Sequence, residues 1–245
     1  MTALVRKNEI VFVSGRTGTG KSKLLYDLFV SRAPRVLSLD PNDEVSERNP
    51  DAIVARGYAQ TLAALRACAP YPQWHIAAVV EEEHFDDLVN LLIPPMMAEE
   101  RTGYARAVGG MALECGELDV LAPVHSASRT VTGMWRRARH NRLSIFAGTQ
   151  RTNECARVCS SQAHHIIAFA QNEPNDIDYL AKAISRPAAE MIGRLPLHWC
   201  VWFERATGRV YLMDPDRRVV QTVSTWGDTI EPDSDADTQT TLDIG

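Results

Sequence analysis

The stretch Gly15-Arg16-Thr17-Gly18-Thr19-Gly20-Lys21-Ser22 fits the pattern G-x-x-x-x-G-K-[ST] of a phosphate-binding loop, or P-loop. An apolar run at 10–13 precedes it and predicts a buried strand, and an amphipathic stretch after it predicts a helix. The glycines let backbone N–H groups wrap phosphate oxygens at the N-terminus of that helix. We expect Lys21 to reach the terminal phosphates of ATP and the Ser22 hydroxyl to bind Mg²⁺. The residues predicted to hold the nucleotide are Gly15, Thr17, Gly18, Thr19, Gly20, Lys21 and Ser22.

Beyond the loop, short β-branched runs alternate with longer amphipathic stretches, which is typical of a mainly parallel sheet flanked by helices. We predict strands at Glu9–Ser14, Arg35–Leu39, His75–Val80, Gly110–Glu114, Leu143–Gly148 and His164–Ala170. We predict helices at Lys21–Ser31, Ala59–Ala67, Phe85–Leu92, Thr130–His140 and Asn175–Ser185. After Pro196, two short apolar runs around a turn predict a β-hairpin over about 197–214. The expected fold class is therefore α/β, with a β-hairpin added at the C-terminal side.

The charge of the chain is unevenly distributed. The chain has 245 residues, with 31 acidic and 26 basic side chains, and six of the acidic ones lie in 227–245, where no basic residue occurs. That segment also lacks aromatic residues, so it cannot bury enough apolar surface to order itself alone. We expect a single domain over 1–226 and an acidic tail over 227–245 that is disordered or docked on a partner.

The composition also excludes some classes of protein. The apolar runs are far shorter than the roughly 18 residues that a membrane-spanning helix needs. The apolar stretch after Lys7 ends at Ser14-Gly15 without a small-residue cleavage site, so we expect no secretion. Five cysteines are an odd number in such a chain, which favours free thiols over disulfides.

A P-loop NTPase also needs a carboxylate at the end of a neighbouring strand to hold the Mg²⁺ water shell. Two segments have this apolar-then-acidic form: Ala77 to Glu83, and Gly110 to Glu117 with Glu114 at its strand end. The pattern alone does not decide between them. Further along, the buried run from Leu143 ends in Gln150, whose amide suits contact with the γ-phosphate or the attacking water.

Arginines are concentrated around that last strand. Between Val120 and Arg157 a single acid, Glu154, faces seven arginines, namely Arg129, Arg136, Arg137, Arg139, Arg142, Arg151 and Arg157. Surface helices usually mix charges of both signs, so this excess indicates a function. One arginine could act as a finger on a neighbouring subunit's nucleotide, and others could meet nucleic-acid phosphates. An Arg-rich surface paired with acids elsewhere in the chain is the structural alternative.

Taken together, these pieces resemble the FtsK/HerA superfamily of DNA-pumping ATPases. The stretch Arg139-His140-Asn141-Arg142-Leu143-Ser144-Ile145-Phe146-Ala147-Gly148-Thr149-Gln150-Arg151 is similar to the family's segment from arginine finger to strand-end T-Q-R. Leu39-Asp40-Pro41 and Ser161 to Phe169 are also similar, so the resemblance covers roughly 10–169. It implies a RecA-like core with ATP and Mg²⁺, with Glu114 as the metal carboxylate, Arg139 as a finger acting on the next subunit, and Gln150 as a sensor.

The chain departs from the family at one position. The family usually has Asp-Glu where this chain has Glu114-Cys115, so a thiol occupies the place of the water-activating glutamate. A thiol is a poor general base for phosphoryl transfer. Either Glu117 takes over this catalytic role, or Glu114 does both jobs, or hydrolysis is slow; we favour Glu117.

The short chain without extra domains is most similar to the genome-packaging ATPases of tailless viruses with an internal membrane. This resemblance implies a homo-oligomeric ring, a pentamer or a hexamer, that moves double-stranded DNA and meets capsid vertex or portal proteins. It implies a location in the host cytoplasm or at the virion vertex, with only indirect contact to membrane. The segment around Arg101 and Arg106 and the stretch 151–157 are candidate DNA contacts. The alternatives are an export ATPase of the zonula-occludens-toxin type and a nucleotide-gated adaptor with little hydrolysis.

Overall fold

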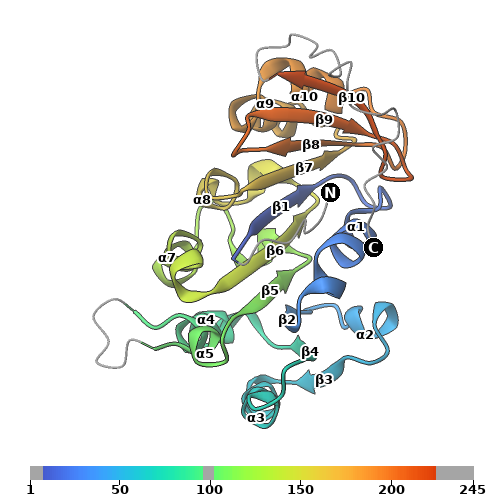
Figure 1. Ribbon diagram of the computed structural model, residues 1–245. Coiled ribbons are helices and arrows are strands. Elements are labelled where there is room, and N and C mark those ends of the chain that lie inside the picture. Colours follow the sequence, from blue (N-terminus) through green and yellow to red (C-terminus); the bar gives the residue numbers. More distant parts are fainter. Residues whose placement is uncertain (1–7, 96–101, 225–245) are drawn as a thin grey trace.

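The strand that enters the P-loop, β1 (Ile10–Ser14), is buried along its whole length. It lies in the interior of a ten-stranded sheet in the computed structural model, which describes residues 8–95 and 102–224 (Figure 1). The sheet order is β10-β9-β8-β7-β1-β6-β5-β2-β4-β3, so β7 and β6 flank the P-loop strand. A strand covered on both faces needs apolar residues at every position, and the sequence Ile-Val-Phe-Val supplies them.

The other strands are β2 (Arg35–Leu39), β3 (Ile53–Arg56), β4 (Trp74–Val79), β5 (Met111–Cys115), β6 (Leu143–Thr149), β7 (His165–Phe169), β8 (Cys200–Glu204), β9 (Arg209–Met213) and β10 (Val219–Ser224). The α-helices are α1 (Lys21–Leu28), α2 (Val45–Arg48), α3 (Tyr58–Cys68), α4 (Phe85–Leu92), α5 (Tyr104–Ala107), α6 (Leu118–Leu121), α7 (Arg129–Arg137), α8 (Arg157–Ser161), α9 (Pro174–Ala183) and α10 (Arg186–Ile192). Short 3-10 helices are η1 (Val30–Arg32), η2 (Glu82–His84), η3 (Arg139–Asn141) and η4 (Thr152–Glu154).

The seven strands from β3 to β7 in the sheet order pair in parallel, whereas β8, β9 and β10 pair antiparallel. Parallel neighbours end at the same edge of a sheet, so the loops after β1, β5 and β6 all emerge there. The strand register agrees with this placement. Ser14, the last residue of β1, pairs with Thr149, the last residue of β6, and Glu114 of β5 pairs with Phe146 of β6. The predicted α/β class is therefore confirmed, and the candidate residues after these three strands are brought to one edge.

Helices cover both faces of the sheet and create two apolar cores. On one face, Leu24, Leu25 and Leu28 of α1 pack against residues such as Phe146 of β6. On the other face, the larger core includes residues of α3, α4, α7, α9 and α10. The period of three and four between the buried leucines of α1 explains why this segment forms a helix with one apolar face.

Two edge elements differ from the prediction. β3 pairs with β4 at one edge of the sheet and was not predicted, since two of its four side chains are exposed and its apolar run is short. At the other edge, the predicted hairpin forms as β8 and β9, and a third strand, β10, continues it. The acidic tail over 227–245 lies outside the described residues. None of the helices within 8–95 and 102–224 has the length and apolar content that crossing a bilayer requires.

Candidate functional site

The P-loop approaches the end of β7 closely. A Cβ added to Gly15 would lie 2.6 Å from the Cβ of Phe169, so no larger residue fits there without moving the strand. Gly20 adopts φ +100° where α1 begins, a conformation that favours glycine. Lys21 is buried, and its Nζ donates to the carbonyl oxygen of Arg16 at 3.0 Å, so the ammonium lies over the loop. Burial lowers the pKa of Lys21, while the charges of Glu117 and Asp119 oppose this shift.

Ser22 and Glu114 line the same small cleft beside the loop, and Glu117 is also part of its lining. Glu81, in the competing acidic segment, is not among the residues of that cleft. Hydroxyl and carboxylate oxygens are ligands that Mg²⁺ accepts, and Mg²⁺ usually keeps several waters and substrate phosphates in its shell. The residues present therefore fit the metal. Among the described residues, no group of three or more His, Cys, Asp or Glu could hold an ion without a nucleotide.

The Glu114 carboxylate is 2% exposed and is held by side chains that the sequence analysis did not select. Its Oε2 accepts from the hydroxyl of Ser38 on β2, and its Oε1 lies 3.6 Å from Nη1 of Arg48 on α2. Burial raises the pKa of Glu114, whereas the Ser38 hydrogen bond and then the Arg48 charge act against this rise. Both oxygens thus face groups that favour the ionised form needed for metal binding.

A hydrogen-bond chain fixes the direction of the Ser38 hydroxyl. Nδ2 of Asn49 lies 2.7 Å from Nδ1 of His75, and an amide nitrogen can only donate, so Nδ1 accepts. The proton of the neutral ring is then on Nε2, which lies 2.6 Å from Oγ of Ser38 and donates to it. Ser38 is left to donate toward Glu114. Burial, followed by the charge of Arg48, lowers the pKa of His75 to about 4 and favours this neutral ring.

Glu117 and Cys115 lie in very different surroundings. Cys115 ends β5 inside the core, and burial raises the pKa of its thiol, so it cannot serve as a base near neutral pH. Glu117 lies in the cleft; burial and the charge of Asp119 raise its pKa, while Lys21 and a hydrogen bond with Gln150 lower it. A carboxylate with a raised pKa beside the phosphate loop suits proton abstraction from water.

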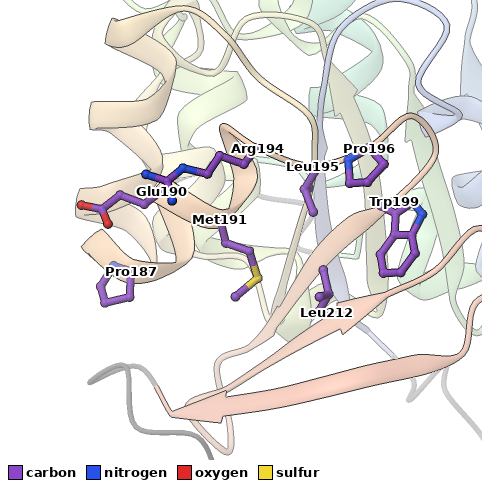
Figure 2. A pocket seen from close by; sticks show the side chains of 8 residues that line it. All are labelled: Pro187, Glu190, Met191, Arg194, Leu195, Pro196, Trp199 and Leu212. Atoms are coloured by element: carbon purple, nitrogen blue, oxygen red, sulfur yellow. The ribbon is translucent and has the colours of Figure 1, made fainter.

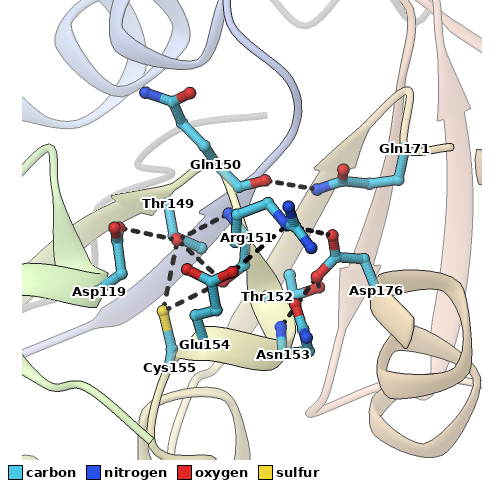
Figure 3. A network of polar contacts seen from close by, with 10 residues as sticks. All are labelled: Asp119, Thr149, Gln150, Arg151, Thr152, Asn153, Glu154, Cys155, Gln171 and Asp176. Carbon is cyan, nitrogen blue, oxygen red and sulfur yellow. Dashed lines mark hydrogen bonds and ion pairs between the residues drawn. The ribbon is translucent and has the colours of Figure 1, made fainter. Parts of the chain in front are cut away.

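Gln150 contacts the P-loop directly from the end of β6. Its Oε1 accepts from the hydroxyl of Thr17 at 2.6 Å. Its backbone carbonyl accepts from Nε2 of Gln171, which follows β7, at 3.3 Å (Figure 3). The predicted sensor is therefore connected to the loop that binds phosphate and to the next strand.

The residues after Gln150 converge on Asp176 of α9, which was missed by the sequence analysis (Figure 3). This carboxylate is fully buried. It accepts from Arg151 Nε at 3.1 Å, from the Thr152 hydroxyl at 2.9 Å and from the Asn153 amide at 2.9 Å. Asp176 follows Pro174 in the first turn of a helix, where an acid is common for electrostatic reasons alone, so its sequence position gave no distinctive signal.

Arg139 lies at the opposite end of β6, in the exposed 3-10 helix η3. β6 has seven residues, and at about 3.3 Å per residue its ends are roughly 20 Å apart. His164 is a neighbour of Arg139. Burial is the main cause that lowers the pKa of His164, and the charges of His165 and then Arg139 also lower it. Arg139 therefore cannot reach the P-loop of its own chain.

Two of the seven arginines are bound by groups of the chain itself. Arg137 donates to the carbonyl oxygens of Gly133 and Pro94, and Arg151 pairs with Asp176, so these two have structural roles. In α7 the buried residues are Val131, Met134 and Trp135, which leaves Arg129 and Arg136 on the exposed side. Arg106 is exposed, whereas Arg101 lies outside the described residues.

A separate pocket of about 430 Å³ lies between α10, the segment 194–199 and β9 (Figure 2). Its wall is mostly apolar and includes Met191, Leu195, Trp199 and Leu212. None of the residues predicted for the nucleotide site lines it.

A P-loop after an interior strand, a buried carboxylate on β5 and a glutamine after the intervening β6 define a RecA-like P-loop NTPase fold. The genome packaging NTPase B204 from Sulfolobus turreted icosahedral virus 2, in complex with sulfate, has this fold with a TM-score of 0.68 and 20% identity. The match covers 86% of this chain and 98% of that one. The ATP-gammaS complex of the same protein gives 0.67, 18% identity and 86% and 99% coverage.

B204, described as the DNA-packaging ATPase from Sulfolobus turreted icosahedral virus, gives a TM-score of 0.64 at 19% identity, over 86% of this chain and 99% of that one. The resemblance to packaging ATPases predicted from the sequence is thus confirmed at the level of the fold. No protein-family model matches the chain, and a search of curated proteins gave no match.

Proposed function

We propose that the chain is an ATPase that moves double-stranded DNA as part of a viral genome-packaging motor. The observation that carries this proposal is the arrangement along β6, with Gln150 hydrogen-bonded to the P-loop at one end and Arg139 exposed at the other. An arginine roughly 20 Å from the P-loop of its own chain cannot contact its own phosphates, so a role of Arg139 in hydrolysis requires a second subunit. The fold shared with B204, a genome packaging NTPase solved with ATP-gammaS, supports the same proposal.

In this proposal each residue of the site has a separate task. The P-loop backbone and Lys21 bind the phosphates of ATP. Ser22 and Glu114 would hold Mg²⁺, which when bound neutralises charge on the phosphate oxygens. Glu117 takes a proton from the attacking water, and Gln150 senses the γ-phosphate through its position beside Thr17.

The finger acts between subunits of a homo-oligomeric ring. Arg139 of one subunit meets the transferring phosphoryl group bound to the next, where arginine fingers accelerate hydrolysis by about 10³ to 10⁵ in well-studied NTPases. Pore-facing basic residues contact DNA phosphates without reading base sequence, and such contacts weaken with salt. A pentamer or hexamer at the capsid vertex, in contact with portal proteins, is the corresponding assembly.

The test is steady-state ATP hydrolysis with and without linear double-stranded DNA at low and moderate salt, with Lys21→Ala as the blank. We expect DNA to stimulate hydrolysis and the stimulation to decline as salt rises. Hydrolysis that does not respond to DNA at either salt concentration would contradict the translocase. Nucleotide binding without turnover, with or without DNA, would contradict the ATPase and favour an adaptor.

Mixing two inactive variants tests the finger. Arg139→Ala subunits keep a complete P-loop and Lys21→Ala subunits keep the finger, so mixed rings contain some complete sites. We expect activity to reappear in the mixture and not in either variant alone. Absence of activity at every mixing ratio would contradict a finger acting between subunits.

A further inference from the structure

The C-terminal strands meet the nucleotide edge of the sheet. Phe169 at the end of β7 pairs with Cys200 at the start of β8, and Cys200 pairs with Met213 at the end of β9. Ser14, the last residue of β1, pairs with Ala168 in the same region. The segment before β8 and the turn between β9 and β10 therefore emerge beside the P-loop.

Two residues of these segments have left-handed backbone conformations that are uncommon for non-glycine residues. His198, before β8, has φ +67°, and Arg217, in the turn 214–218, also has φ +67°. The turn is held by backbone hydrogen bonds between Asp214 and both Arg217 and Arg218. Residues held in such conformations are enriched at ligand sites, which makes both positions candidates for contact with a ligand.

Both side chains contact the P-loop or the ring beneath it. Nδ1 of His198 lies 3.2 Å from the carbonyl oxygen of Thr19. The Arg217 guanidinium carbon lies 5.9 Å from the centre of the Phe169 ring. The same ring would lie 3.7 Å from a Cβ added to Gly20. Nη1 of Arg217 is buried without a hydrogen-bond partner among the described residues, so the guanidinium has an unmet donor.

The direction of a bound nucleotide follows from the sheet order. In the proposed site Gln150 and Glu114 serve the terminal phosphate and its metal; Gln150 follows β6 and Glu114 is the penultimate residue of β5, both on one side of β1. The phosphate chain runs along the loop, so the nucleoside leaves on the other side, where β7, β8, β9 and β10 lie. The segments that emerge on that side include the loop 170–173 after β7 and the turn 214–218, and the turn places Arg217 beside the Phe169 ring.

We propose that the turn 214–218 forms the nucleoside end of the nucleotide site, with the Arg217 guanidinium stacking on the purine base and His198 bracing the P-loop. A planar guanidinium can stack on the base with one face while the other remains toward Phe169. The inference rests on the proposed ATPase function and adds that the C-terminal strands belong to its nucleotide site.

The test compares two ligands that share phosphates and differ in the nucleoside. Binding of ADP and of inorganic pyrophosphate is measured by calorimetry on the full chain. Arg217→Ala is expected to weaken ADP binding roughly tenfold, the size of a partly desolvated cation–π contact, and to leave pyrophosphate binding unchanged. Arg218→Ala is the matched control from the same turn; its side chain is exposed and pairs only loosely with Asp216 at 3.9 Å, so neither ligand should be affected.

Arg217→Gly separates binding from folding, because glycine adopts the left-handed conformation without strain. We expect it to melt no lower than the unmodified chain and to lose ADP affinity as Arg217→Ala does. ADP affinity within twofold of the unmodified chain, or equal loss of ADP and pyrophosphate, would overturn the proposal. Lys21→Ala should weaken both ligands; retention of both would instead contradict the P-loop assignment and the proposed function with it.

Discussion

Asp176 offers the sharpest test of how the segment after Gln150 is held in place. Replacing it by alanine removes the acceptor for the Arg151 side chain, the Thr152 hydroxyl and the Asn153 amide. Arg151 has 40% of its side chain exposed and can turn to water, so its loss is small. Thr152 is fully buried, and an unsatisfied buried donor costs about 1–3 kcal/mol.

The two donors left without an acceptor, on Thr152 and Asn153, together predict a destabilisation of roughly 3 kcal/mol for Asp176→Ala. In a chain of this size that corresponds to a fall in melting temperature of about 6–12 °C. The free energy of unfolding is measured by urea denaturation, and the melting temperature by circular dichroism.

Asp178→Ala is the matched control, because Asp178 lies on the same helix, is 54% exposed and pairs with Arg186 at the surface. Its expected cost is below about 1 kcal/mol. Asp176→Asn keeps one acceptor oxygen and should fall between the two. A cost for Asp176→Ala no larger than that for Asp178→Ala would refute the view that Asp176 organises this segment.

Two further predictions concern protonation. The pKa of His75 is about 4 in the folded chain and near its ordinary 6.5 when unfolded, so the unfolded chain takes up the proton first as the pH falls. Between pH 7 and pH 5 the unmodified chain should therefore lose roughly 2 kcal/mol more free energy of unfolding than a His75→Gln variant does. Urea unfolding at both pH values measures the two losses. Equal losses would contradict the neutral buried ring. All five cysteines are buried and unpaired, and burial raises the pKa of the Cys115 thiol among them. A thiol reagent such as DTNB should therefore react with none of them until urea unfolds the chain. Rapid labelling of the native protein would contradict this burial and show that the core opens.

The central part of the fold could be predicted from the sequence because its signals are local. The P-loop requires glycines at fixed positions, and strands buried on both faces require continuous apolar runs, so β1, β2, β4, β5, β6 and β7 were found with small boundary errors. Gln150 and Glu114 were placed correctly at one edge, because each lies at the carboxyl end of its strand. The assignment of Glu114 over the Glu81 segment needed the family resemblance in addition.

The remaining elements depend on partners far away in the chain. β3 and β10 are edge strands, and their four and six residues gain order from pairing with β4 and β9 and not from their own composition. Asp176, Ser38, His75 and Arg48 are ordinary polar residues in sequence, and only the folded chain brings them to Glu114 or to the segment after Gln150. Composition does not distinguish an arginine that binds a backbone carbonyl, such as Arg137, from one that faces solvent, so the separate roles of the arginines could not be assigned from the sequence.

The strand β6 fixes the distance between Arg139 and Gln150 in the proposed motor. It is buried at every position and pairs along its length with β1 and β5, so it can neither stretch nor coil. Insertion of one residue would turn each following side chain to the other face of the sheet, and insertion of two would lengthen the strand by about 7 Å. The number of residues between Arg139 and Gln150 therefore sets the distance between finger and sensor. In the proposed ring, the interface with the neighbouring subunit that receives the finger must match this distance.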